Sequence, residues 1–127
     1  MQSRDINAPD APAPISAYSQ AVEVTAVTRT LYISGQVGVD IDGNIPDDFM
    51  EQSRLVWANV SAQLRAAEMT LDNVVKFVTI LPNAADIAAS RTSRQEALGN
   101  HRPAHTLIIG GLANAAWMIE VEAVAVA

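Results

Sequence analysis

The chain has 127 residues, which is enough for one folded domain and too few for two domains of the usual size. Half of the residues are hydrophobic and 17% are charged, so the composition excludes a disordered or fibrous protein, and the absence of cysteine excludes disulfides and cysteine-based chemistry. A net charge of −6 disfavours binding to nucleic acid and to anionic membranes, because both repel an acidic surface.

Residues 1–14 are predicted to be an extended lead-in within a single domain that spans residues 1–127. Three of the six prolines lie within residues 8–14, where they fix φ and withhold amide donors, so a helix is disfavoured there. The polar N-terminus lacks the apolar centre of a signal peptide, and no run of 18 apolar residues occurs. We therefore expect a cytoplasmic protein that contacts no membrane.

Two runs rich in β-branched residues follow the lead-in, at residues 18–27 and 31–37. The short stretch between them predicts that they form a β-hairpin. Asp48 then provides a helix N-cap, with Glu51 three residues beyond it, and apolar residues recur at helical spacing as far as Ala67. This pattern predicts the longest helix of the chain.

The second half of the chain alternates between strand and helix patterns. Residues 74–81 are dense in β-branched residues and predict a buried strand, and Asn83 is a candidate cap for a second helix that ends at Gly99. Two strands, at residues 105–109 and 117–126, are predicted to close the chain as a hairpin. The order ββαβαββ predicts an α+β fold, in which one mixed sheet is covered on one face by two helices and its other face is left for another subunit.

Residues 91–105 locally invert the charge of the chain. They contain three arginines, Arg91, Arg94 and Arg102, and a single acid, Glu96. Arginine is suited to bidentate binding of a carboxylate or phosphate, so the cluster is a candidate anion site. A solvated helix face explains the same pattern, and the residues alone leave both interpretations open.

Glu120 and Glu122 lie two positions apart in an otherwise apolar strand, so both side chains face the same side of the sheet. A carboxylate near apolar walls has its charged form disfavoured, which suits an acid–base group or a group that positions water. An edge strand with a wet face, or an ion pair with arginine, is the alternative interpretation.

No metal or cofactor is predicted. His101 and His105 have the spacing of two metal ligands on one helix face, but Pro103 between them prevents a continuous helix. Gly35 and Gly38 lack the spacing and the Gly-Lys-Ser/Thr ending of a phosphate loop. No serine lies in a nucleophile-elbow motif.

Short blocks at residues 13–21, 33–37, 72–76, 102–104 and 119–125 together resemble the Rid family of reactive intermediate deaminases, also called the YjgF or L-PSP family. The resemblance covers nearly the whole chain. It implies a chorismate-mutase-like fold, a homotrimer with inward-facing sheets, and three clefts between subunits. It also implies that a small carboxylated enamine or imine is hydrolysed there, without a cofactor, to a keto acid and ammonia.

The resemblance also implies which residues line the cleft. Tyr18 matches the tyrosine of the family's cleft, and Ser34 with Gly35 matches the segment beside the ligand. Glu120 matches the acidic residue that places the water. We therefore expect Tyr18 and Glu120 to be catalytic.

The chain departs from the family pattern at His105. Active deaminases carry the motif Pro-Ala-Arg, whose arginine binds the substrate carboxylate, whereas this chain reads Pro-Ala-His. Histidine lacks the two-pronged contact of a guanidinium, so carboxylate binding should weaken by about 1.5–3 kcal/mol unless another group compensates. Our hypothesis is that Arg91, on the second helix where deaminases place an asparagine, supplies the displaced charge.

Three functions remain open from the sequence: an imine or enamine hydrolase, a non-catalytic trimer that binds a small ligand, and a ribonuclease. The ribonuclease is disfavoured, because the chain is acidic, contains one lysine and lacks a paired catalytic histidine motif.

Overall fold

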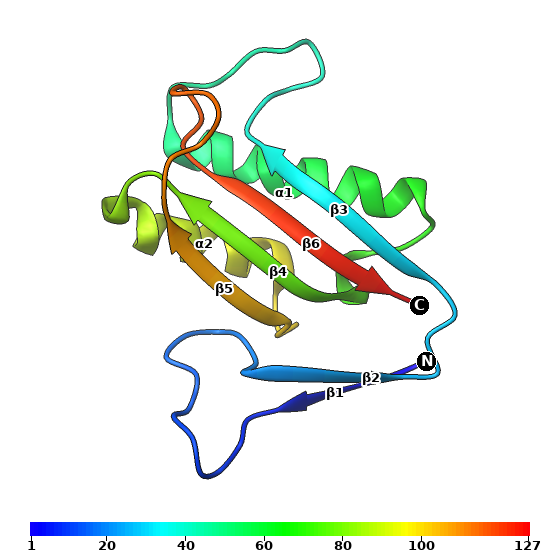
Figure 1. Ribbon diagram of the computed structural model, residues 1–127. Helices are drawn as coiled ribbons and strands as arrows, with labels where there is room; N and C mark the ends of the chain where they lie inside the picture. Colours follow the sequence, from blue (N-terminus) through cyan, green and yellow to red (C-terminus); the bar gives the residue numbers. More distant parts are fainter.

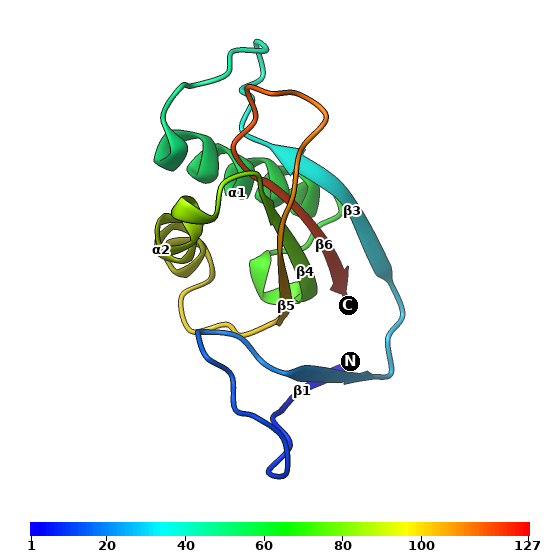
Figure 2. The ribbon, with the colours of Figure 1, turned by 60° about the vertical axis from the view of Figure 1, so that its left-hand side comes forward.

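The computed structural model describes all 127 residues, and its main part is a four-stranded mixed sheet with two helices on one face (Figure 1). The strands of this sheet, in spatial order, are β3 (Thr30–Val37), β6 (Glu120–Val126), β4 (Val74–Leu81) and β5 (Ala104–Ile109). The helices are α1 (Phe49–Ala66) and α2 (Ile87–Leu98). Strand β6 is antiparallel to both of its neighbours, and β5 is parallel to β4. Figure 2 shows both helices on the same side of the sheet, so the predicted α+β fold is confirmed.

Helix α1 begins where the sequence predicts, because the Asp48 carboxylate accepts the amide proton of Glu51 at 3.0 Å. Its inward face packs against β3 and β6 through apolar side chains at helical spacing: Val56, Trp57, Val60 and Leu64. The buried Gln52 fastens α1 to the loop before β6. Its amide nitrogen donates to the carbonyl oxygen of Ala116, and its amide oxygen accepts from the backbone N–H of Met118.

Helix α2 also lies where the sequence predicts. The Asn83 side chain accepts the amide proton of Ala85 and caps the short 3-10 turn η2 (Ala84–Asp86), which leads directly into α2. Gly99 ends the helix with a φ of 58°, a conformation that favours glycine. A second 3-10 turn, η1 (Leu71–Asn73), precedes β4. Neither helix is long and apolar enough to cross a bilayer.

The predicted hairpin between residues 18–27 and 31–37 is wrong. Ala21–Thr25 forms strand β2, which pairs antiparallel with strand β1 (Gln2–Ile6). Part of the predicted lead-in is therefore a strand. Figure 1 shows β1 and β2 as a two-stranded ribbon apart from the main sheet.

The linker between β2 and β3 explains why these two strands do not pair. Ala26 has a φ of 54°, which turns the chain away from the direction of β2. The backbone N–H groups of Thr28 and Arg29 then both donate to the carbonyl oxygen of Ala127. The linker is thus attached to the end of β6, and β3 continues along β6 instead of folding back on β2.

The predicted closing hairpin is also wrong, because β4 lies between β5 and β6. Strand β5 follows the crossover helix α2 and pairs in parallel with β4, as expected for a β-α-β unit. Residues 110–119 form a loop that carries the chain past β4, so β6 begins at Glu120 rather than at residue 117. Strand β6 occupies an inner position because its inward residues are small or apolar and buried: Val121, Ala123 and Ala125.

Candidate functional site

A cavity of about 280 Å³ lies at the β5 edge of the sheet, beside α2, and we call it the edge pocket. The segment before β2 forms one of its walls. This segment is held against β5 by Ser19, whose backbone N–H donates to the Pro103 carbonyl at 3.2 Å and whose hydroxyl donates to the Arg102 carbonyl at 2.5 Å. The pocket is lined by Ile15, Ser16, Tyr18, Ile87, Arg91, Arg94, His105 and Leu107. Three predicted site residues, Tyr18, Arg91 and His105, therefore lie together.

The ring of His105 makes four contacts with other side chains of the chain. Its ring stacks on Phe77 with centroids 4.1 Å apart, and the ring of Tyr18 approaches edge-on at 6.2 Å. Its Nε2 lies 3.0 Å from the hydroxyl of Thr79, and its Nδ1 lies 3.1 Å from Arg94 Nη1. Both ring nitrogens are therefore engaged within the chain.

His105 is uncharged at neutral pH. Burial, followed by the nearby charges of Arg94 and Lys76, lowers the pKa of His105 from 6.5 to about 3. A guanidinium has no acceptor, so the neutral imidazole accepts from Arg94 through Nδ1. Nε2 then carries the proton and donates to Thr79. His105 cannot replace the charge of an arginine in this state.

Arg94 belongs to the predicted arginine cluster, but it was not predicted to contact the ligand. It is only 4% exposed, and its Nη2 donates to the Ser16 hydroxyl at 2.7 Å. Burial, with the charges of Arg91 and Arg102, lowers the pKa of its guanidinium, and no carboxylate forms an ion pair with it. Its signal was in the sequence, because Ile87, Arg91, Arg94 and Leu98 follow helical spacing on α2.

The other predicted site residues, Ser34, Gly35 and Glu120, lie on β3 and β6. The register of β3 against β6 shifts between Ile33 and Gln36, so Ser34 and Gly35 occupy an irregularity of the strand. The Glu120 side chain fills the space above Gly35: a Cβ on Gly35 would lie 2.6 Å from Glu120 Cδ. Only glycine leaves the carboxylate in this position.

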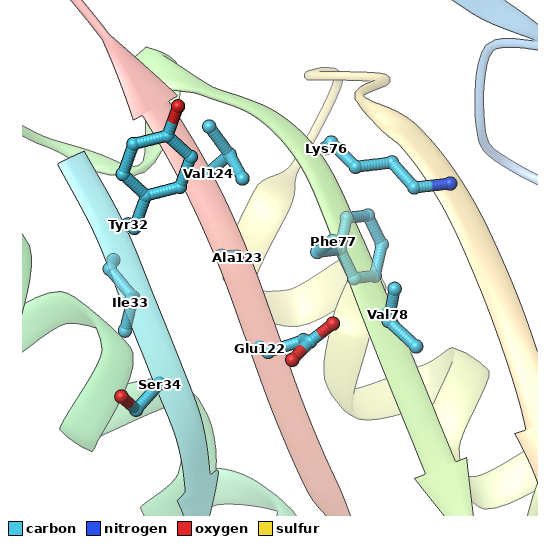
Figure 3. A pocket seen from close by; sticks show the side chains of 9 residues that line it. All are labelled: Tyr32, Ile33, Ser34, Lys76, Phe77, Val78, Glu122, Ala123 and Val124. Carbon is cyan, nitrogen blue, oxygen red and sulfur yellow. The ribbon is translucent and has the colours of Figure 1, made fainter. Parts of the chain in front are cut away.

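A second cavity lies on the face of the sheet that the helices leave open, and Figure 3 shows its side chains. Glu122 of β6 and Ser34 of β3 line it, whereas Glu120 does not. Lys76 of β4 also lines it, and its ammonium donates to the hydroxyl of Thr106 at 2.8 Å. Glu120 and Glu122 therefore have different surroundings: Glu120 lies against Gly35, and Glu122 lines the open-face cavity. The strand pattern alone does not predict this difference.

The two groups of predicted site residues do not meet within one chain. Ser34 and Gly35 lie on β3, and His105 lies on β5, at the opposite edge of the sheet. Three strand spacings of ~4.8 Å place these edges ~14 Å apart. His105 also contacts Phe77 in the helix-covered core, whereas Glu120 alternates with the buried Val121 and so faces the other way.

Comparison with known proteins assigns the chain to a family. It matches the model of the endoribonuclease L-PSP family over residues 8–127. The chain belongs to the Rid (YjgF/L-PSP) family. The resemblance inferred from its sequence blocks is thereby confirmed.

Individual Rid proteins match along nearly the whole chain. A 2-iminobutanoate/2-iminopropanoate deaminase from goat (Capra hircus) is 33% identical over 125 residues, which are 97% of this chain and 89% of the goat protein. The structure of the Rid protein YyfB from Yersinia pestis superposes with a TM-score of 0.86 at 30% identity and covers 100% of both chains. RidA from an Antarctic Psychrobacter superposes with a TM-score of 0.74 at 30% identity, over 98% of this chain and 99% of that one. Imine deaminases are thus members of the family.

The remaining residues of the charge-inverted segment have structural contacts in this Rid protein. Arg102 donates to the Gly99 carbonyl at 2.6 Å, at the end of α2, and Glu96 forms an exposed ion pair with Arg54 of α1 at 3.2 Å. The Nε2 of His101 lies 2.7 Å from the carbonyl oxygen of Val74. Only Arg91 and Arg94 of the predicted cluster line the edge pocket.

Proposed function

We propose that this chain is a cofactor-free deaminase that hydrolyses small 2-imino acids, and the enamines that tautomerise to them, to 2-keto acids and ammonia. The observation that carries the proposal is the edge pocket, where two arginines without an acid partner lie beside Tyr18 and apolar walls. Such a pocket suits a small anion with a short apolar side chain. The deaminase name of a relative at 33% identity supports the same reaction.

The proposed site is completed by a second copy of the chain. One group of predicted site residues lies in the edge pocket: Tyr18, Arg91 and His105. The other group lies on strands β3 and β6: Ser34, Gly35 and Glu120. A cleft between two copies of the chain brings both groups to one ligand. The open face of the sheet is suited to contact, because Tyr32 is 78% exposed there. Repeating one such edge-to-face contact around a three-fold axis gives a closed homotrimer with three clefts.

In this cleft, the substrate carboxylate is bound by an arginine of α2. Glu120 accepts a proton from water while the water oxygen bonds to C2 of the protonated imine. Glu120 then gives this proton to the nitrogen of the resulting carbinolamine. The C–N bond breaks and ammonia leaves, while the C2 hydroxyl returns a proton to the Glu120 carboxylate and becomes the keto group. The Tyr18 hydroxyl accepts the amide proton of Ile15 at 3.4 Å, so its own O–H is available to the reacting centre.

Ammonia release tests this proposal. An L-amino-acid oxidase, with catalase present, generates 2-iminobutanoate from L-2-aminobutyrate in situ. We expect purified protein to release ammonia and 2-oxobutyrate faster than buffer with the same oxidase. A rate equal to that background would reject the hydrolase and leave the non-catalytic binder, for which the replacement of the family's arginine by His105 is the supporting observation.

Subunit mixing tests whether the cleft lies between copies. One inactive variant carries Glu120→Gln, and the other carries Arg91→Ala with Arg94→Ala. If the variants are unfolded together in equal amounts and refolded, a random trimer has both intact halves in about one cleft in four, so we expect about a quarter of the wild-type rate. A site built within one chain would regain no activity in any mixture.

The ribonuclease remains the least supported alternative. The name of the family model includes this activity, but the chain has a net charge of −6 and a single lysine. A phosphate backbone requires several cations along one surface.

A further inference from the structure

Arg94 is a buried charge without a counter-charge. It is 4% exposed, and the two ion pairs of the protein join other residues, Arg4 with Glu23 and Arg54 with Glu96. Burying a charge without a partner is unfavourable, and such groups concentrate at functional sites. A ligand of opposite charge in the edge pocket would supply the missing partner.

The Arg94 guanidinium has donors left for such a ligand. Of its five N–H groups, one on Nη1 is directed to His105 and one on Nη2 to Ser16. Its Nε–H is buried and has no partner. A carboxylate takes two parallel hydrogen bonds from neighbouring guanidinium N–H groups, and Nε with Nη2 forms such a pair.

His105 holds this guanidinium in place. Its ring is fixed by stacking on Phe77 and by the hydrogen bond from Nε2 to Thr79. Nδ1 is therefore presented to Arg94 as an acceptor. An arginine at position 105 would have no acceptor to offer and would repel Arg94 instead.

We propose that Arg94 is the residue that binds the ligand carboxylate, and that His105 is a positioning residue that orients the Arg94 guanidinium through Nδ1. Compared with the Pro-Ala-Arg pattern of the family, the positive charge that binds the carboxylate thus lies on helix α2 instead of strand β5. The ligands of this pocket are small 2-keto or 2-imino monocarboxylates. The inference rests on the proposed function for the identity of the ligand but not for the binding itself.

Arg91 has a different part in the same pocket. It forms no ion pair and is less buried than Arg94, and no side chain orients it as His105 and Ser16 orient Arg94. It adds positive potential at the pocket. We therefore expect its removal to weaken carboxylate binding far less than removal of Arg94.

The pH dependence of binding separates Arg94 from His105 as the anchor. The charged and titratable groups around His105 are Arg94 and Arg91 of α2, Tyr18, and Lys76 of β4 on the opposite face of the sheet, and none of them is a carboxylate. His105 therefore remains neutral, and we expect the affinity to change by less than about twofold between pH 5 and pH 8. A protonated histidine as anchor would instead lose affinity as the pH rises through about 6.5.

Calorimetric titration of the full chain with 2-oxobutyrate tests the proposal without requiring turnover. Arg94→Met should weaken binding by about 10- to 100-fold, and the same change at the exposed Arg65 of α1 should leave it unaltered. The neutral amide of 2-oxobutyrate should bind wild-type protein and Arg94→Met equally weakly. Circular dichroism verifies the fold, and Arg94→Lys serves as a second variant, in which the charge remains but the two-pronged contact is lost.

Two variants of His105 test its positioning role. His105→Gln supplies a side-chain oxygen that can accept from Arg94, so affinity should remain within about threefold of wild type. His105→Phe retains the stacked ring but removes the acceptor, and it should weaken 2-oxobutyrate binding about tenfold. Equal losses in both variants would show that an acceptor at position 105 does not orient Arg94 and would overturn the assignment of His105 as a positioning residue.

The outcomes separate this inference from the proposed function. If wild-type protein binds 2-oxobutyrate through Arg94 but releases no ammonia, the deaminase proposal fails and the inference stands. If ammonia is released while Arg94→Met and Arg94→Lys bind normally, or while Arg91→Met causes the larger loss, the inference fails and the deaminase proposal stands. Absence of 2-oxobutyrate binding to wild-type protein also overturns the inference.

Discussion

Replacing Glu120 with glutamine is expected to lower the rate of ammonia release by about 10²- to 10⁴-fold, the usual contribution of a general base. Glutamine has the same shape and fits the space above Gly35, where a Cβ would lie 2.6 Å from Glu120 Cδ, so the packing of β3 on β6 is retained. It cannot accept a proton from water. The affinity for 2-oxobutyrate should change by less than about threefold, so the loss of rate should appear as a lower kcat.

Glu122→Gln is the matched variant for this measurement, because Glu122 lies two residues along the same strand and lines the open-face cavity instead. Its rate should remain within about threefold of wild type, since no step of the proposed reaction uses it. If Glu122→Gln lowered the rate of ammonia release more than Glu120→Gln, Glu122 would be the general base. Equal, normal rates in both would remove the acid–base role from strand β6.

The largest effect on stability is expected for Phe77→Ala. Phe77 is 1% exposed, contacts Trp57 edge-on with ring centroids 5.4 Å apart, and supports the stacked ring of His105 at 4.1 Å. Removing the ring opens a cavity in the middle of the core, which typically costs about 3–5 kcal/mol in the free energy of unfolding. Urea denaturation at one fixed protein concentration measures the change, because association also contributes to apparent stability.

Phe77→Leu separates packing from the specific aromatic contact. Leucine fills most of the volume, so its free energy of unfolding should fall by about 1.5 kcal/mol or less. It does not provide a flat surface for His105, and carboxylate binding should weaken through the loss of Arg94 orientation. A loss below about 1 kcal/mol for Phe77→Ala would show that α1 and β4 repack around the missing ring.

The elements that sequence reasoning predicted well are those specified by neighbouring residues. The Asp48 cap, the Asn83 cap and the terminal Gly99 act within one helical turn, so α1 and α2 could be placed from the sequence. Strand pairing depends instead on distant residues. The attachment of the linker to Ala127 and the loop at residues 110–119 decide the partners of β2 and β6, and no local pattern records either.

The site could be predicted only in part, because it also depends on contacts between distant residues. Tyr18, Arg91 and His105 were selected from separate blocks of the chain, and folding brings them to one pocket. Arg94 was predicted only as a member of the arginine cluster, because arginine is ordinarily exposed and the burial of Arg94 depends on acceptors supplied by Ser16 and His105. The uncovered face of the sheet indicated another subunit, but the pattern of a single sequence does not show which residues a second copy would bring to the proposed cleft.

The ribbon of β1 and β2 offers a way to follow association through the backbone. Each of its strands has one hydrogen-bonded neighbour, whereas β4 has two. A lone two-stranded ribbon is marginally stable in water, so its amide protons should exchange with deuterated solvent much faster than those of β4. A copy that packs against the ribbon slows this exchange. Deuterium uptake across a dilution series therefore reports subunit contact from residues that take no part in catalysis.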